Sequence, residues 1–291
     1  MTHIPVLLEE TIAVLNPKPN ENFIDCTFGR GGHTRVLLEK TAPNGIVIGL
    51  DLDAQSLESY RAENIVDARL VLENINFADI DRSEAIKRVS PINGILYDLG
   101  MSSWHIDDSK KGFAFSKDEA LDMRYDQNDS VTAASLVNSA PAAELEKIFS
   151  EYGQERHARK IAKAIETARR QKKIETAGHL ALIVSRVITP AQKNASLARI
   201  FQALRIAVNR ELENVERGLA AGFEIVSPGG RMAVIAFHSL EDRIVKLKFR
   251  ELVAQGRARL VLEKPAAPTE SEVASNPRSR SAKLRAIEKI K

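Results

Sequence analysis

The segment DCTFGRGGH (residues 25–33) decides the fold, because it follows an apolar run and precedes a helical pattern. Its Gly29, Gly31 and Gly32 allow a tight turn and the close approach of a ligand to the backbone. The spacing is GxGG followed by His33, whereas a dinucleotide fingerprint reads GxGxxG and holds a pyrophosphate at the helix N-terminus. The turn therefore lacks the arrangement that a phosphate-containing ligand needs.

On both sides of this segment, short β-branched runs alternate with helical patterns, as a parallel sheet with crossover helices requires. The predicted strands are NFIDCT (22–27), GIVIGLD (45–51), ARLVLE (68–73) and GILYDL (94–99), and the predicted helices cover 33–40, 54–63 and 79–89. The pattern predicts an α/β fold with a Rossmann-like sheet.

Three of these strands end at or near a carboxylate: Asp25, Asp51 and Asp98. Ligands of such sheets bind outside the carboxyl ends of the strands, so we expect the three aspartates to meet in one crevice. Asp51 stands 20 positions after Gly31, where an acid that binds ribose hydroxyls is expected. The alternative is that Asp51 caps the helix from residue 54 onward.

After Asp98 the pattern changes, and residues 105–198 give several helical patterns with no strand between them. The α/β pattern resumes with a long helix over 199–222, the strand RMAVIAF (231–237), a helix over 240–254 and the runs RARLVLE and SAKLRAIEK. We therefore predict one domain made of 1–104 and 199–291, interrupted by a helical substrate-recognition subdomain over 105–198.

The composition is that of a soluble globular protein, with 291 residues, 44% hydrophobic and 28% charged. No apolar run approaches the roughly 20 residues that span a bilayer, and the first residues lack the pattern of a secretory signal. We expect a cytoplasmic protein without membrane association. The single cysteine, Cys26, excludes an internal disulfide and fits a small buried residue, and His33 and His238 are too isolated to predict a metal site.

Charge is strongly segregated along the chain. Residues 1–153 carry 14 Lys and Arg against 25 Asp and Glu, residues 154–210 carry 13 against 3, and residues 257–291 carry 9 against 4. The two basic regions are typical of a surface that binds a polyanion such as nucleic acid. The alternative is a solvated helix face, which usually mixes both signs.

Asp98 opens the segment DLGMSS, which also contains Ser102 and Ser103. An amine whose lone pair is delocalised into an aromatic ring becomes nucleophilic when acceptors hold its N–H groups. Asp98, Ser102 and Ser103 are therefore the candidate catalytic residues. Alternatively, Asp98 only hydrogen-bonds loop amides or a cofactor.

Several motifs resemble one family over nearly the full length, the bacterial 16S rRNA cytosine-N4 methyltransferases. They are HIPVLLEE (3–10), IDCTFGRGGHT (24–34), YDLGMSS (97–103), GFAF (112–115), LDMRYD (121–126), FQALRIAVNREL (201–212), AFHSLEDRIVK (236–246) and NPRSRSAKLR (276–285). The resemblance implies a class I methyltransferase sheet of seven strands with a final antiparallel pair. It also implies the cofactor S-adenosyl-L-methionine and a cytidine in the decoding region of 16S rRNA, within the small ribosomal subunit, as substrate. The oligomeric state stays open, a homodimer included.

The resemblance further implies cofactor contacts at Gly31, Gly32, His33, Asp51, Phe77 and Asp98. Where the family usually has glutamine, this chain has His105, which we keep as a candidate cofactor residue. Phe77 follows a strand, where its ring can stack on adenine, and the alternative is a core phenylalanine.

The candidate RNA-binding residues are aromatic rings, a histidine at the edge of the sheet and the basic tail: Trp104, Phe113, Phe115, His238, Arg278, Arg280, Lys283 and Arg285. Unpaired bases are commonly recognised by stacking on rings, and phosphates by basic groups. For each ring, core packing is the alternative, and for His238 a hydrogen bond within its loop.

Two other functions compete with this hypothesis. A nicotinamide-dependent oxidoreductase is disfavoured by the GxGG spacing and the basic insert. A non-catalytic RNA-binding or ribosome-assembly factor is disfavoured by Asp51 and Asp98, because a domain without activity has no need of carboxylates in its crevice.

Overall fold

The structure is a computed structural model that describes residues 5–63, 67–101 and 110–291. The chain forms two compact units, a sheet unit of Met1–Gly100 and Leu212–Lys291 and a helical unit of Met101–Glu211. No helix within the described ranges is long and apolar enough to cross a membrane.

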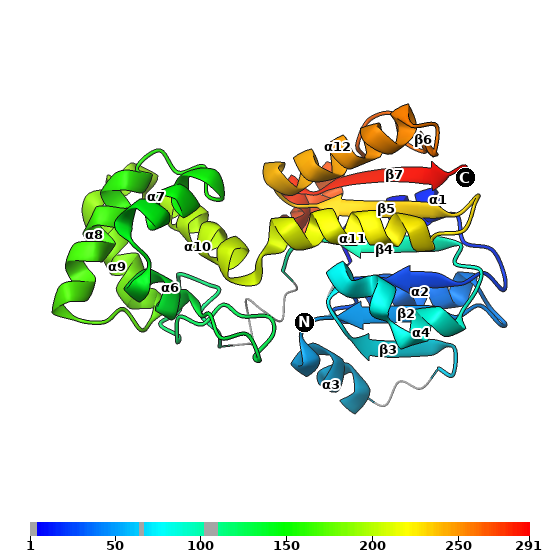
Figure 1. The fold of residues 1–291 in the computed structure, drawn as a ribbon, viewed down its shortest axis with the longest axis horizontal. Helices are drawn as coiled ribbons and strands as arrows, with labels where there is room; N and C mark the ends of the chain where they lie inside the picture. The colour runs from blue at the N-terminus through cyan, green and yellow to red at the C-terminus, as the bar shows by residue number, and fades with distance from the viewer. Residues whose placement is uncertain (1–4, 64–66, 102–109) are drawn as a thin grey trace. The chain divides into compact units, whose positions relative to one another are not determined.

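The sheet unit is built on one sheet of seven strands in the order β3-β2-β1-β4-β5-β7-β6 (Figure 1). Strands β1 to β5 are parallel to one another, and β7 is antiparallel to both β5 and β6. The strands are β1 (Phe23–Asp25), β2 (Val47–Asp51), β3 (Leu70–Asn74), β4 (Gly94–Asp98), β5 (Arg231–Ala236), β6 (Ala258–Leu260) and β7 (Lys283–Lys289). The predicted class I methyltransferase sheet is confirmed, including its final antiparallel pair. From β1 the chain adds β2 and β3 on one side of the sheet and then crosses back to place β4 on the other side of β1. The strand order therefore reverses between β1 and β4, which is the switch point where such sheets bind ligands.

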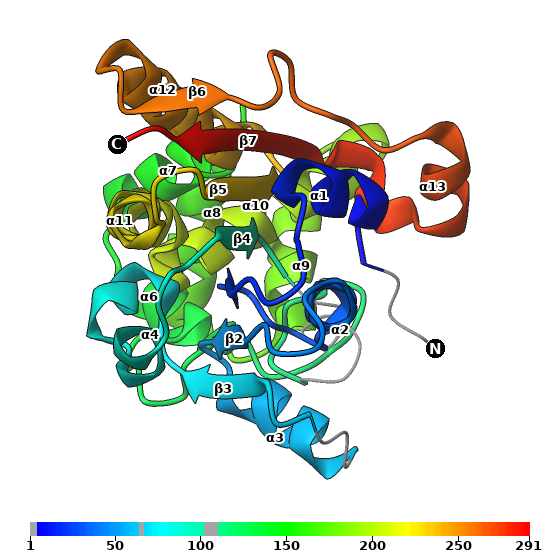
Figure 2. The same cartoon turned by 90° about the vertical axis from the view of Figure 1, so that its right-hand side faces the viewer.

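Helices cover both faces of the sheet (Figure 2). One face carries α1 (Leu8–Leu15), α2 (Gly32–Lys40) and α13 (Glu270–Ser275), and the other α4 (Glu84–Arg88), α11 (Glu211–Ile225) and α12 (Ser239–Ala254). The remaining elements of this unit are α3 (Ala54–Ala62), η1 (Phe77–Arg82) and η3 (Pro277–Ser281). The central strands are apolar on both sides because both sides are buried: Leu96 of β4 packs into one core, and Ile95 and Tyr97 pack into the other.

Tyr97 links the sheet to α11. Its hydroxyl donates a hydrogen bond of 2.7 Å to the carbonyl oxygen of Gly218, and a Cβ at Gly222 would overlap this hydroxyl. Phe77 meets the Tyr97 ring edge to face, with the ring centroids 5.5 Å apart. Glycine on α11 is therefore what lets the helix lie close to β4.

The helical unit has a hydrophobic core of its own, to which each of its α-helices contributes buried side chains. Its elements are α6 (Ala133–Ser139), α7 (Ala142–Glu151), α8 (Ala158–Gln171), α9 (Ala177–Val187), η2 (Pro190–Gln192) and α10 (Lys193–Asn209). In α8, one stripe containing Ile161 and Ile165 is buried, while most of its basic residues are exposed to solvent. Arg169 is the exception, because it is half-buried and donates hydrogen bonds to the carbonyl oxygens of Val137 and Ala140.

The predicted single helix over 199–222 is wrong. The helix α10 ends at Asn209, Arg210 takes a left-handed conformation with φ 50°, and α11 begins at Glu211. Because Leu197, Ile200 and Leu204 belong to the core of the helical unit, this unit reaches residue 211, whereas we expected the insert to end at 198. No glycine or proline marks the break, so the sequence pattern runs through it.

Candidate active site

The three strand-end aspartates meet, as predicted from the sequence. Asp25 pairs with Gly49 on β2 and with Leu96 on β4, and Asp51 and Asp98 lie two residues further along these strands. Side chains two residues apart share a face of a sheet, so the three carboxylates project from the same face. Their charges act on one another: Asp51 raises the pKa of Asp25, and Asp25 raises the pKa of Asp98.

The glycine-rich turn between β1 and α2 is held by Asp51. One oxygen of Asp51 accepts the Gly29 N–H at 2.8 Å, and the other accepts the Asp53 N–H at 2.9 Å. Gly29 and Gly31 both have positive φ, at 52° and 68°. Glycine is needed for that backbone conformation, because other residues are strained there.

Packing within the protein gives a second reason for these glycines. A Cβ at Gly31 would press on the Phe28 ring, and a Cβ at Gly32 would overlap Pro5. A ligand could then contact this turn through its backbone. Gly31 and Gly32 stay predicted cofactor contacts.

The alternative that Asp51 caps the following helix is wrong. The N-cap of α3 is Asp53, whose side chain accepts the Gln55 N–H at 3.0 Å. Asn74 at the end of β3 donates to the carbonyl oxygens of Asp51 and Leu52, which fixes the chain just beyond β2. Asp51 therefore holds the glycine turn and is not the N-cap of α3, and its contact with the cofactor ribose stays a prediction.

Asp98 and His33 lie side by side. His33 is 5% exposed, and its Nε2 lies 3.1 Å from the carbonyl oxygen of Val6, which can only accept, so Nε2 carries a hydrogen. Its Nδ1 faces Asp98 Oδ2 at 3.7 Å. The other oxygen of Asp98, Oδ1, is buried and has no hydrogen-bond partner among the described residues. Burial, followed by the charges of Asp25 and Glu241, holds the pKa of Asp98 well above its usual range.

Asp25 is 2% exposed and lies between the glycine turn and α2. It accepts a hydrogen bond of 2.7 Å from the Thr34 hydroxyl and one of 3.2 Å from the Thr27 N–H. Burial is the main cause that raises the pKa of Asp25 to about 6, against the hydrogen bond from Thr34. Sequence reasoning noticed Asp25 as a strand-end acid but did not select it as a site residue.

Glu241 is an acid of this edge that sequence reasoning missed. It is 1% exposed, and one of its oxygens accepts the N–H groups of Phe237 at 2.8 Å and His238 at 3.3 Å. The His238 ring in turn accepts the Glu241 N–H, so the two residues form the capping box of α12. The loop hydrogen bond considered for His238 is present, and contact with RNA stays a prediction. The only signal for Glu241 in the sequence is its place in the first turn of the helix after β5.

The predicted aromatic residues lie in different surroundings. Phe77 is half-buried against the core of the sheet unit. Phe113 is 6% exposed and stacks on Tyr125 with centroids 5.5 Å apart, and Phe115 meets Phe201 edge to face, so both rings contribute to packing of the helical unit. Core packing, the alternative considered for each ring, is present at all three. Ser102, Ser103, Trp104 and His105 lie outside the described residues.

The basic tail divides into two pairs. Arg278 and Arg280 are exposed on η3. Lys283 and Arg285 on β7 form ion pairs with Asp242, at 3.3 and 2.7 Å. Part of the positive charge counted in the sequence is therefore offset within the sheet unit.

Comparison with known proteins identifies the family. The chain matches the model of the MraW methylase family over residues 1–290. It belongs to that family. Ribosomal RNA small subunit methyltransferase H of Syntrophotalea carbinolica is 42% identical over 307 residues, covering 99% of this chain and 98% of the relative. The protein of the same name from Elusimicrobium minutum is 45% identical over 290 residues, covering 99% of each chain. A solved rRNA methylase from Streptococcus thermophilus aligns over 100% of both chains, with a TM-score of 0.44 and 11% identity.

The family predicted from the motifs is thus confirmed, and this methylase is an enzyme that uses S-adenosylmethionine. Two observations fit that cofactor, which carries a sulfonium and an ammonium group. The acidic edge formed by Asp25, Asp51 and Asp98 suits a cation, and the buried Oδ1 of Asp98 accepts no hydrogen bond from the described residues. Asp51 and the glycine turn are the residues that we expect to hold the nucleoside and methionine parts.

We expect Asp51→Ala to weaken S-adenosylmethionine binding by about 1.5–3 kcal/mol, the size of a lost hydrogen bond to a charged group, with RNA affinity nearly unchanged. Calorimetric titration with each ligand measures both effects. Asp53→Ala is the matched control, because it removes the cap of α3 and should lower stability by about 1 kcal/mol without weakening the cofactor. Equal cofactor affinity in Asp51→Ala and the parent contradicts the ribose role.

Proposed function

We propose that this methylase transfers a methyl group from S-adenosylmethionine to the exocyclic N4 amine of a cytidine in the decoding region of 16S rRNA, within the small ribosomal subunit. The observation that carries the proposal is Asp98, a strand-end acid whose buried Oδ1 has no hydrogen-bond partner among the described residues and is suited to accept an amine N–H. The curated relatives, named ribosomal RNA small subunit methyltransferases, support the substrate class. This substrate lies in the cytoplasm, where we expect the chain to act.

Asp98 is suited to orient an aromatic amine. The cytosine amine is a poor nucleophile because its lone pair is delocalised into the ring. An N–H held by Oδ1 turns the amine and localises the lone pair, while Oδ2 faces His33. The bound cofactor supplies the methyl group on a positively charged sulfur. Most of the acceleration then comes from positioning, and the methylated amine loses its proton readily without a strong base.

The solvent side of α8 supports a polyanionic substrate. Its exposed residues include Arg159, Lys160, Lys163 and Arg170, and its acidic Glu166 pairs with Arg170 at 3.6 Å. A solvated face of mixed charge is the alternative, but this face is almost entirely positive. Arg278 and Arg280 add exposed charge on the sheet unit. Such groups match the phosphates of RNA.

A non-catalytic RNA-binding factor is the rival hypothesis. Burying Asp25, Asp98 and Glu241 near one another costs free energy, and a scaffold without a ligand would be more stable with apolar residues there. The acids therefore favour an active site.

The proposed function is tested by incubating the protein with methyl-labelled S-adenosylmethionine and small ribosomal subunits that lack the modification, followed by nucleoside analysis. We expect label in N4-methylcytidine at one position of 16S rRNA. Naked 16S rRNA in a parallel reaction shows whether the assembled subunit is required. Label in another nucleoside, or no transfer to either substrate, contradicts the proposal.

We expect Asp98→Asn to lower the rate of methyl transfer far more than RNA affinity, because an interaction made mainly in the transition state appears in kcat. Single-turnover rates and filter binding of the same variant give the two quantities. If cofactor affinity falls as much as the rate, Asp98 is a cofactor ligand only and does not orient the amine.

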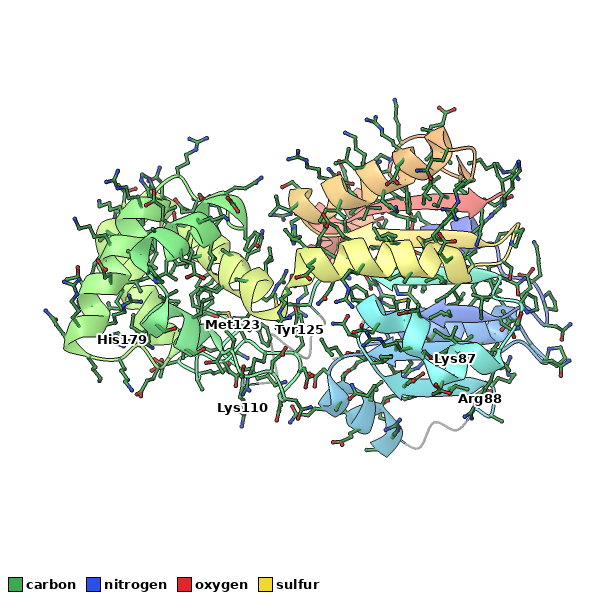
Figure 3. All side chains as sticks on the ribbon, viewed as in Figure 1. Lys87, Arg88, Lys110, Met123, Tyr125 and His179 are labelled. Atoms are coloured by element: carbon green, nitrogen blue, oxygen red, sulfur yellow. The ribbon has the colours of Figure 1, made fainter. Side chains whose placement is uncertain are left out.

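RNA affinity is expected to fall steeply with salt, with a log–log slope near −0.7 for each phosphate contacted on a single strand. Replacing both Arg278 and Arg280 with Ala should reduce the size of this slope by about one to two units and leave cofactor binding intact. Lys87 and Arg88, exposed on α4 in the acidic half of the chain (Figure 3), provide the matched double substitution and should not change the slope. An unchanged slope in the tail variant places the RNA surface elsewhere.

A further inference from the structure

The carboxyl end of β4, where Asp98 lies, is held differently on its two sides. On the side of β5 the backbone bonds continue past Asp98, because the Leu99 N–H donates to the carbonyl oxygen of Ile235 at 2.9 Å. On the side of β1, the last backbone bond between described residues is the one of 2.9 Å from the Cys26 N–H to the carbonyl oxygen of Leu96. Beyond this bond β1 turns away into the glycine-rich segment. The N–H of Asp98 therefore needs an acceptor that is not a strand carbonyl.

Thr27 supplies that acceptor. Its Oγ1 accepts the Asp98 N–H at 2.6 Å, across 71 positions of the sequence. Thr27 is itself held in place, since its N–H donates to Asp25 Oδ1 at 3.2 Å, and the Thr34 hydroxyl donates to the other oxygen of Asp25 at 2.7 Å. A side chain that is branched at Cβ has few rotamers, so the position of Oγ1 is well defined. The main chain of Asp98 is thus fixed by β5 on one side and by Thr27 on the other.

We infer that Thr27 is a positioning residue for methyl transfer, which acts by fixing the main chain from which the Asp98 carboxylate projects. Asp98 Oδ1 has no hydrogen-bond partner among the described residues, so its direction depends on the backbone and on the rotamer. The rate of a reaction depends steeply on the placement of the groups that orient the reacting atoms, and a shift of about 1 Å can cost about 100-fold. The inference rests on the proposed function, in which Asp98 holds the amine.

The experiment compares two substitutions of Thr27 in single-turnover methyl transfer to small ribosomal subunits that lack the modification. Thr27→Val removes the acceptor and nearly keeps the shape of the side chain, whereas Thr27→Ser keeps the acceptor. We expect Thr27→Val to lower the rate by about 10- to 100-fold and Thr27→Ser to stay near the parent. The affinity for S-adenosylmethionine, measured by calorimetric titration, should change little, because an effect on orientation appears in kcat. A rate of Thr27→Val equal to that of the parent, or a loss of affinity as large as the loss of rate, overturns the inference.

A double-mutant cycle with Asp98→Ala assigns the effect to Asp98. This variant keeps the N–H that Thr27 accepts but removes the carboxylate, so adding Thr27→Val should lower the rate almost no further. The same loss in both backgrounds shows that Thr27 acts on another part of the site, which overturns the inference.

The cycle also separates a failure of the inference from a failure of the proposed function. If Asp98→Ala is as fast as the parent, Asp98 does not orient the amine, and the proposed role of Asp98 is wrong together with the inference. If Asp98→Ala is slow while Thr27→Val is fast, only the inference is wrong.

Thermal unfolding of each variant shows whether a lower rate reflects a general loss of structure. Thr41→Val is the matched control, because Thr41 is a buried threonine at the C-terminal end of α2 whose hydroxyl donates to the carbonyl oxygen of Leu37 at 2.9 Å. It should lower the stability and leave the rate of methyl transfer unchanged. If Thr27→Val does not fold, Thr27→Ala removes the same acceptor with a smaller side chain, and the same results are expected from it.

Discussion

Because β2, β1 and β4 are adjacent and parallel, the aspartates at their carboxyl ends lie close together at the switch point of the sheet. The repulsion between these negative charges is the constraint on which the arrangement of the site depends. Asp25, Asp51 and Asp98 end adjacent strands and project from one face. Their repulsion is offset by hydrogen-bond donors, as in the bonds from the Gly29 N–H to Asp51 and from the Thr34 hydroxyl to Asp25. The conformation of the glycine turn therefore depends on Asp51, whose two carboxylate oxygens accept the N–H groups of Gly29 and Asp53.

The sheet and the main acids could be predicted because their signals are local. A strand buried on both sides is an uninterrupted apolar run, and an acid directly after such a run must lie at the carboxyl edge. The position of Asp51 relative to the glycine turn follows from the fixed length of a strand-turn-helix-strand unit. From the sequence, Asp51 could either bind ribose hydroxyls or cap the following helix. The structure excludes the cap, because Asp53 accepts the Gln55 N–H at the start of α3. An offset of two residues decides this, and a helix boundary cannot be predicted from sequence more finely than that.

The parts that could not be predicted depend on contacts between distant segments. The end of α10 has no breaker in the sequence, since Arg210 takes the left-handed conformation that glycine usually provides. Phe113 resembles a ring on an exposed loop until it is seen stacked on Tyr125. Glu241 has the sequence signature of an ordinary first-turn helix acid. Its influence on Asp98 arises only because β5 lies beside β4 in the sheet, and strand order is not encoded in local pattern.

The charge counted along a sequence overstates the charge that is available to a partner, and the basic tail over residues 276–285 is an example. Lys283 and Arg285 were grouped with Arg278 and Arg280 because they are close in sequence, but both are paired with Asp242. Ion pairs of this kind hold β7 against α12, and a phosphate would have to compete with a carboxylate already in place. The long-range attraction of RNA depends on basic residues exposed on the surface, and salt screens this attraction over about 8–10 Å. The segregation of charge along the sequence favours a polyanionic partner. The position of the binding surface depends in addition on which basic side chains form ion pairs in the folded chain.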